Sequence, residues 1–137
     1  MDNLYRDFIL EHYRTPHNKG HLDPHDLEFA DSNPTCGDEM SMTIQLDESK
    51  DTIADVAFDG RGCAISQASA SILTDDLRGK SIEEIKAMDP KQLLDELGVP
   101  IGPARLKCAL LSYKVLQGAV RGAGVAWPKE AEAVAGA

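Results

Sequence analysis

The stretch MSMTIQLD, residues 40–47, most constrains the fold because its apolar and polar residues alternate strictly. The apolar members are Met40, Met42, Ile44 and Leu46. A period of two is typical of a strand with one buried face. The stretch TIADVAFDG, residues 52–60, has strand character too, and the turn DESKD separates the two. This arrangement predicts an antiparallel hairpin, to which DLEFADS, residues 26–32, adds a third strand.

Helical patterns flank the predicted sheet. The predicted helices cover residues 3–14, 64–79, 89–98 and 103–122. Apolar residues recur at helical spacing in the first two, Gly79 and Gly98 are stop signals, and the last begins with a proline. Between them, Ser81 and Glu84 match a capping box. Strands followed by helices predict an α+β fold.

Length and charge limit the protein's organisation and partners. The 137 residues suggest one domain, which we expect to cover residues 1–121, with 122–137 as a flexible tail. A net charge of −9 disfavours nucleic acid as a partner and favours a basic face on another protein. No apolar run reaches the roughly 20 residues of a membrane helix, and the N-terminus lacks a signal-peptide block. We therefore expect no membrane partner and a cytoplasmic location.

Three cysteines and one aspartate are the candidates for chemistry. Cys36 and Asp38 flank Gly37, Cys63 precedes a predicted helix, and Cys108 lies in the second turn of the last one. A helix N-terminus favours thiolate over thiol, and Arg61 would add to this effect. If these elements converge, three thiolates and a carboxylate would suit zinc or an iron–sulfur cluster.

These residues also have simpler interpretations than a metal site. Buried cysteines often act as small apolar residues, and Asp38 could bond its own turn backbone. The spacings between the cysteines are not local, so they carry no metal-site signature of their own. All four histidines (His12, His17, His21 and His25) fall within or just before the polar stretch TPHNKGHLDPHD. We expect them to form a solvated surface rather than a metal site.

Four stretches together resemble a known family. They are HYRTPHNKG, NPTCGDEM, FDGRGCAISQASASIL and RLKCALLSYKVL. This combination resembles the U-type iron–sulfur cluster assembly proteins, SufU and IscU, which are similar to the N-terminal part of NifU. The resemblance covers roughly Leu4 to Val120. It includes a C-G-D turn, a cysteine that opens a helix and a cysteine in the final helix, in that order.

The resemblance implies a fold and a site. The fold is a small three-stranded antiparallel sheet with helices packed on one face. The site brings Cys36, Asp38, Cys63 and Cys108 together near the surface, where they would hold Zn²⁺ or, in the alternative, a transient [2Fe–2S] cluster. Ligand hardness by itself would make Asp38 the position that exchanges most easily, because a carboxylate is a harder ligand than a thiolate.

The resemblance also implies an activity. SufU-like proteins accept sulfur from a pyridoxal-phosphate cysteine desulfurase of the SufS type, so the chain would be that enzyme's sulfur acceptor rather than a stand-alone enzyme. A partner ligand would free Cys36, whose thiolate would receive the sulfur as a persulfide for downstream iron–sulfur assembly proteins. We expect Cys36 to leave the metal and Asp38 to stay, with departure of Asp38 as the alternative. Arg105 and Lys107 could attract the anionic persulfide.

Details near the last cysteine separate the two branches of the family. Lys107 stands where IscU proteins have a histidine, and the chaperone motif of that branch is absent, which favours SufU. The spacing of 45 between Cys63 and Cys108 departs from SufU and approaches the shorter IscU length. A zinc-dependent sulfurtransferase is the first hypothesis, a cluster scaffold the second, and a structural zinc module the third. Lys107 also fits a solvated stripe with Lys114 and Arg121.

Overall fold

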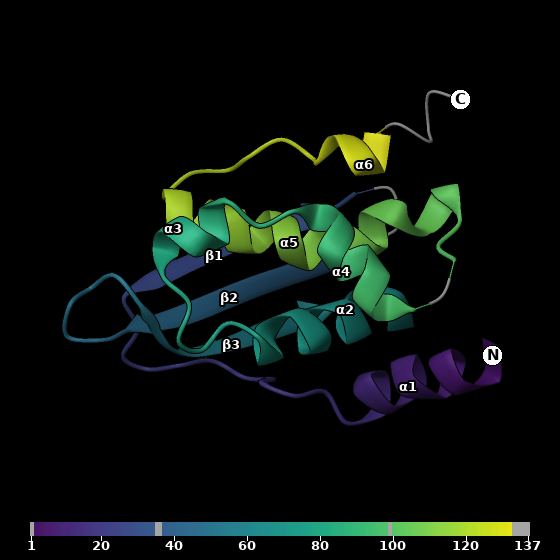
Figure 1. Cartoon of the computed structure of the whole chain (residues 1–137), viewed down its shortest axis with the longest axis horizontal. Coiled ribbons are helices and arrows are strands. Elements are labelled where there is room, and N and C mark those ends of the chain that lie inside the picture. Colours follow the sequence, from purple (N-terminus) through teal and green to yellow (C-terminus); the bar gives the residue numbers. More distant parts are fainter. Residues whose placement is uncertain (1, 35–36, 99, 133–137) are drawn as a thin grey trace.

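Three strands form one antiparallel sheet in the order β1-β2-β3 (Figure 1). The computed structural model describes residues 2–34, 37–98 and 100–132. The strands are β1 (Leu27–Asn33), β2 (Asp38–Leu46) and β3 (Ile53–Arg61). The predicted hairpin and the third strand are therefore confirmed.

The strand register brings the start of β2 beside the end of β3. Asn33 pairs with Asp38, and Glu39 pairs with Arg61. Gly60 permits this close pairing, because a Cβ there would lie 2.1 Å from the carbonyl oxygen of Glu39. The φ angle of Gly60, +128°, is also one that side chains disfavour. The chain that leaves β3 therefore passes close to Asp38.

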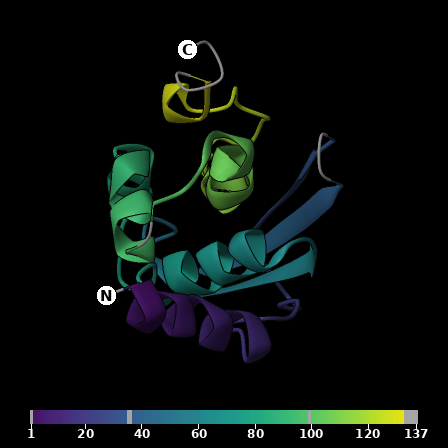
Figure 2. The ribbon, with the colours of Figure 1, turned by 90° about the vertical axis from the view of Figure 1, so that its right-hand side faces the viewer.

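Helices complete an α+β fold, as predicted. They are α1 (Asp2–Arg14), α2 (Ala64–Asp75), α3 (Ile82–Lys86), α4 (Pro90–Leu97), the 3₁₀ turn η1 (Pro103–Arg105), α5 (Leu106–Arg121) and α6 (Lys129–Glu132). Helices α2 and α5 pack against each other and against the sheet, and α1 packs along α2 (Figure 2). Across the three described ranges, no helix is long and apolar enough to cross a membrane.

The hydrophobic core lies between the sheet and helices α2 and α5. Its largest fully buried side chains include Phe58, Met40, Met42, Ile44, Leu110, Leu111 and Leu116. The alternating face predicted for β2 is thus the core face, with Leu46 partly buried at its end. Burial of this continuous apolar surface is the main force that fixes α2 and α5, and with them the residues at their ends.

Local signals set most helix ends, with two differences from the predicted bounds. The capping box is present, with Ser81 Oγ accepting from the Glu84 N–H at 3.1 Å. Helix α2 ends at Asp75, four residues before Gly79, because residues 76–79 form a separate turn. Helix α5 begins at Leu106 after η1, which places Cys108 in its first turn rather than its second.

The C-terminal segment packs on α5. The ammonium groups of Lys107 and Lys114 lie 5.4 and 5.3 Å from the centre of the Trp127 ring, a distance at which cation–π attraction acts. Lys114 is only 8% exposed and forms an ion pair with Asp31. The predicted solvated stripe was therefore wrong for Lys114, because β1 and Trp127 cover it.

Candidate metal centre

Three of the four predicted ligands meet at the end of the sheet. One ligand atom from each of Asp38, Cys63 and Cys108 lies within 4.8 Å of the other two. Asp38 begins β2, Cys63 immediately precedes α2, and Cys108 lies in the first turn of α5. The fourth predicted ligand, Cys36, lies outside the described residues. The fold thus joins ligands that are far apart in the sequence.

Asp38 reaches across to the start of α2. Its Oδ1 accepts a hydrogen bond from the backbone N–H of Cys63 at 2.9 Å, and its side chain is buried, with 1% of the residue exposed. Cys63 is the N-cap of α2 and has no side-chain capping bond. A carboxylate beside a helix N-terminus is electrostatically favourable. This contact joins β2 to α2. The alternative interpretation of Asp38, a hydrogen bond within its own turn, did not anticipate it.

Gly62 makes this contact possible. A Cβ at Gly62 would lie 2.5 Å from Asp38 Oδ1 and 2.4 Å from Ser66 Oγ. Ser66 itself donates to the carbonyl oxygen of Cys63 at 3.0 Å. Sequence reasoning missed both residues as parts of the site. The glycine that precedes Cys63 was the available signal, since glycine permits close approach of the backbone to another group.

The basic residues near the site have varied settings. Arg61 is 81% exposed and lies 3.3 Å from Glu39, so its predicted effect on Cys63 is weakened by that pair and by solvent. Arg105 is exposed in η1, and Lys107 is half-buried with its ammonium over Trp127. Support of an anionic persulfide by Arg105 and Lys107 stays a prediction.

The described donor set fits zinc. Two cysteine sulfurs and one carboxylate oxygen are ligands that Zn²⁺ accepts in four-coordinate sites. Cys108 is buried, whereas Cys63 is partly exposed, so the group has one side toward the protein interior and one toward the surface. Such a half-open group can hold a metal and still present a thiol to another molecule.

Two histidines form a second group of possible ligands at the other end of α2. Ligand atoms of His12, His17 and Asp75 also lie within 4.8 Å of one another. His12 is 7% exposed, so the prediction of a solvated histidine surface was wrong for this residue. Burial lowers the pKa of His12, and the neighbouring His17 lowers it further. Helix α1 buries this ring by packing on α2.

The other two histidines interact with each other. The rings of His21 and His25 lie edge to face, with their centres 5.3 Å apart. His25 Nδ1 is 2.9 Å from the carbonyl oxygen of Leu22, so it donates to that oxygen. Within the described part of the chain, neither ring belongs to a group of three possible metal ligands.

Comparisons with known proteins identify the family of this chain. The sequence model of the NifU-like N terminal domain matches residues 4–123. The zinc-dependent sulfurtransferase SufU of Bacillus subtilis (strain 168) is 41% identical over 135 residues, covering 85% of this chain and 89% of that protein. The iron–sulfur cluster assembly scaffold protein IscU of Streptococcus pyogenes serotype M1 is 38% identical, covering 88% and 85%.

A solved structure has the same fold. It is that of a proposed iron–sulfur cluster assembly scaffold protein for the SUF system of Fervidobacterium islandicum AW-1. The two structures superpose with a TM-score of 0.71 at 28% identity, over 83% of this chain and 94% of the other. With the family model covering most of its length, the chain belongs to the NifU-like N-terminal domain family.

Proposed function

We propose that this protein is a zinc-dependent sulfur acceptor in iron–sulfur cluster assembly, with Cys36 receiving sulfur from a cysteine desulfurase of the SufS type. The observation that carries the proposal is the meeting of Asp38, Cys63 and Cys108 within 4.8 Å. The similarity to a zinc-dependent sulfurtransferase, SufU, supports the same activity. In this proposal the protein acts in the cytoplasm and passes sulfur to downstream iron–sulfur assembly proteins.

The proposed ligands are Cys36, Asp38, Cys63 and Cys108. Bound zinc would keep the cysteine sulfurs deprotonated at neutral pH and hold them unreactive. Asp38 is buried and bonded to the N–H of Cys63, and Cys63 and Cys108 lie at helix starts. These three positions are anchored by the fold. Cys36 stands beside Gly37 in the sequence, and glycine gives the neighbouring backbone conformational freedom, so Cys36 is the ligand that we assign to departure and sulfur transfer.

The transfer itself needs no net oxidant. The Cys36 thiolate attacks the terminal sulfur of the desulfurase persulfide, forming a new sulfur–sulfur bond. The bond between the two sulfurs of the donor breaks, and the desulfurase cysteine leaves as a thiolate. Cys36 then carries the persulfide. Arg105 and Lys107 are proposed to attract its negative charge.

A cluster scaffold is the second candidate function. The carboxylate of Asp38 favours it, because an oxygen ligand among thiolates would make a [2Fe–2S] cluster easier to release. The similarity to an iron–sulfur cluster assembly scaffold protein, IscU, supports the same possibility. In this case the cluster is cargo that the protein assembles and passes on.

Desulfurase turnover separates the two functions. The protein, purified aerobically, is analysed for zinc and iron and added to a SufS-type desulfurase with excess cysteine. The sulfur-acceptor function predicts one zinc in this site and a large increase in turnover that Cys36→Ala abolishes. No increase, together with cluster assembly on the chain under anaerobic conditions, would replace the sulfur-acceptor function by the scaffold.

Two variants test the transfer step: Cys36→Ala tests which thiol accepts the sulfur, and Arg105→Ala tests whether Arg105 supports the transfer. Arg105→Ala serves as the comparison, because its side chain is exposed and its removal leaves all four proposed ligands in place. We expect it to reduce the stimulation several-fold without removing zinc. Stimulation that is unchanged in Cys36→Ala would show that Cys36 is not the acceptor.

A further inference from the structure

The geometry points to a second metal site, separate from the thiol group, formed by His12, His17 and Asp75. We propose that it binds Zn²⁺ or a similar divalent transition-metal ion between α1 and α2. Cys63 precedes α2 and Asp75 ends it. Because 12 helical residues span about 18 Å, this ion would not share ligands with the thiol site.

The fold holds the imidazole of His12 in place for an ion. His12 Nδ1 lies 2.7 Å from Ser71 Oγ, a serine of α2. Metal-binding histidines commonly use one ring nitrogen for the metal and the other for a hydrogen bond to a protein oxygen. Since Ser71 occupies Nδ1, Nε2 is the nitrogen that remains for a metal. Ser71 Oγ also accepts from the backbone N–H of His17 at 2.8 Å, so one serine positions both histidines.

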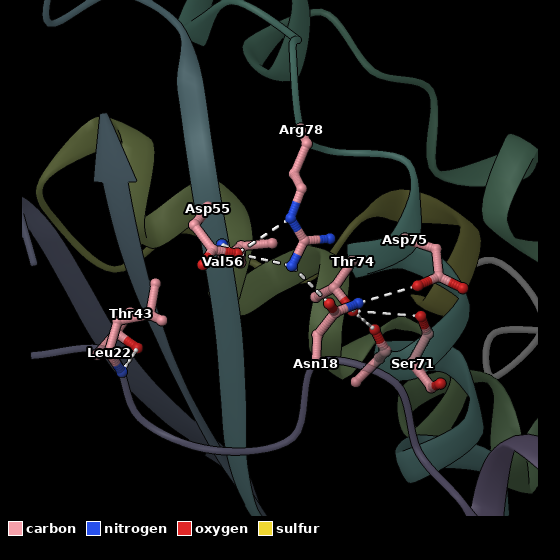
Figure 3. A network of polar contacts seen from close by, with 10 residues as sticks. Asn18, Leu22, Thr43, Asp55, Val56, Ser71, Thr74, Asp75 and Arg78 are labelled. Atoms are coloured by element: carbon pink, nitrogen blue, oxygen red, sulfur yellow. Dashed lines mark hydrogen bonds and ion pairs between the residues drawn. The ribbon is translucent and has the colours of Figure 1, made fainter. Parts of the chain in front are cut away.

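The carboxylate of Asp75 is held from two sides. Asn18 Nδ2 donates to Asp75 Oδ1 at 3.0 Å, and His17 Nδ1 lies 2.6 Å from Asp75 Oδ2. Figure 3 shows that Asn18 also accepts from Arg78 and donates to Thr74, which fixes the amide beside Asp75. The ligand group is thus supported by hydrogen bonds from Ser71 of α2 and from Asn18 of the loop after α1.

The surroundings favour a cation. The end of α2 carries the partial negative charge of the helix C-terminus, where positive charge is stabilising. A surface pocket of about 310 Å³ adjoins the group and is lined by His12, Asp75, Asp76 and Glu96, together with Phe8 and Ile72. These acidic side chains add negative charge, and the pocket gives an ion and its water ligands access.

The ligand types select among ions. Two imidazoles and one carboxylate suit Zn²⁺ and similar transition metals, whereas Mg²⁺ and Ca²⁺ prefer oxygen ligands. Tetrahedral zinc places its ligand atoms about 3.3 Å apart. The ligand atoms of His12, His17 and Asp75 lie within 4.8 Å of one another. Rotation of the exposed His17 side chain can bring them to the shorter separation that zinc needs. A bound ion would take the place of the hydrogen bond between His17 Nδ1 and Asp75 Oδ2.

The test is the amount of zinc bound by the full-length chain at equilibrium. Wild type and variants are dialysed against the same buffered concentration of free Zn²⁺, and bound metal is measured by mass spectrometry. We expect His17→Ala and Asp75→Asn each to bind one equivalent less than wild type. His17 is 53% and Asp75 39% exposed, so neither change disrupts the core. A large excess of Mg²⁺ should not displace this equivalent of zinc from wild type.

The matched control is His21→Ala, in the same loop. Its ring contacts His25, and among the described residues it belongs to no group of three possible ligands, so this variant should bind as much zinc as wild type. Equal zinc contents in wild type, His17→Ala and Asp75→Asn would overturn the proposal. Failure of the thiol site would lower all contents equally and leave the difference of one equivalent, so the two sites are tested independently.

Discussion

The two ends of helix α2 carry two groups of possible ligands that are built differently. At the N-terminal end, Asp38 and Cys108 are buried, and β2, α2 and α5 each contribute one group. At the C-terminal end, only His12 is buried, and His17 and Asp75 are half exposed. The first group depends on close backbone packing, whereas the second depends on hydrogen bonds from side chains such as Ser71 and Asn18.

The two groups should therefore respond differently to substitution. Tight packing leaves no space, so a single added carbon at the N-terminal end must displace something. A hydrogen-bonded group at the surface can adjust, so loss of a partner there costs only the bonds that cannot be replaced by water. The free energy of unfolding of the metal-free protein therefore measures the contrast, and changes at the N-terminal end should have the larger effects.

The largest effect is expected for Gly62→Ala. The new Cβ would meet Asp38 Oδ1 and Ser66 Oγ at 2.5 and 2.4 Å, which breaks the contact between β2 and α2. Overpacking against the buried Asp38, with loss of its hydrogen bond to the Cys63 N–H, should cost about 3 kcal/mol. Urea denaturation of the metal-free protein measures this cost, and zinc binding by the thiol group should weaken with it.

The matched glycine is Gly102, in the loop before η1. A Cβ there would meet nothing within 4 Å, and its φ angle of −67° suits any residue. Gly102→Ala should therefore leave stability within about 0.5 kcal/mol of wild type. Equal stabilities for the two alanine variants would mean that α2 can shift away from Asp38, and the description of the N-terminal end as rigid would be wrong.

A smaller effect is expected for Ser71→Ala at the other end. This change removes the hydroxyl that contacts both His12 Nδ1 and the His17 N–H. Leaving a buried imidazole nitrogen without its partner should cost about 2 kcal/mol. Ser69→Ala is the control, because Ser69 donates to the carbonyl of Ile65 in its own helix. If both serine variants unfold at the same urea concentration, Ser71 does not hold α1 to α2.

Two substitutions of Asp38 separate its structural contact from its proposed role as a ligand. Asp38→Ala removes the charged acceptor for the Cys63 N–H and should cost about 1.5 kcal/mol in the metal-free protein. Asp38→Asn keeps an oxygen in that place, so its stability should stay near that of wild type. Both should weaken zinc binding tenfold or more, because each removes a charged ligand. If the zinc affinity is unchanged in Asp38→Asn, then the role of Asp38 is its hydrogen bond to Cys63 and not metal binding.

The fold could be predicted from short-range patterns, but the sites could not. The alternation around Met42 determines which face of β2 is buried, and caps such as Ser81 act within one turn, so both can be seen in the sequence. The meeting of Asp38 with Cys63 and Cys108 depends on strand register and helix packing. The resemblance to U-type assembly proteins supplied that convergence, since spacing alone carries no signature of it.

Neither the short-range patterns nor the family resemblance predicted the group formed by His12, His17 and Asp75. His12 and His17 are separated from Asp75 by about 60 residues, and the link between them is the packing of α1 on α2. The polar loop around His17 indicated solvent exposure, which is correct for the loop but not for His12. A histidine at a buried position of an amphipathic helix was the one available signal, because polar residues on such a face need a partner.

The smallest effect is expected for Glu96→Gln, which tests whether negative charge accumulates at the C-terminal end of α2. Burial raises the pKa of Glu96, and Asp76 raises it further, while Lys80 lowers it. His12 and Asp75 line the same pocket.

Because the folded protein holds the proton of Glu96 more tightly than the unfolded chain does, the stability falls as the pH rises above the ordinary pKa of 4.5 and through the raised value. Gln carries no such charge, so the variant should be more stable than wild type by a few tenths of a kcal/mol at neutral pH. The difference should vanish near pH 4, where both side chains are uncharged. Urea denaturation at several pH values checks this, and a variant that is less stable than wild type at neutral pH would show that Glu96 contributes a favourable contact rather than unfavourable charge.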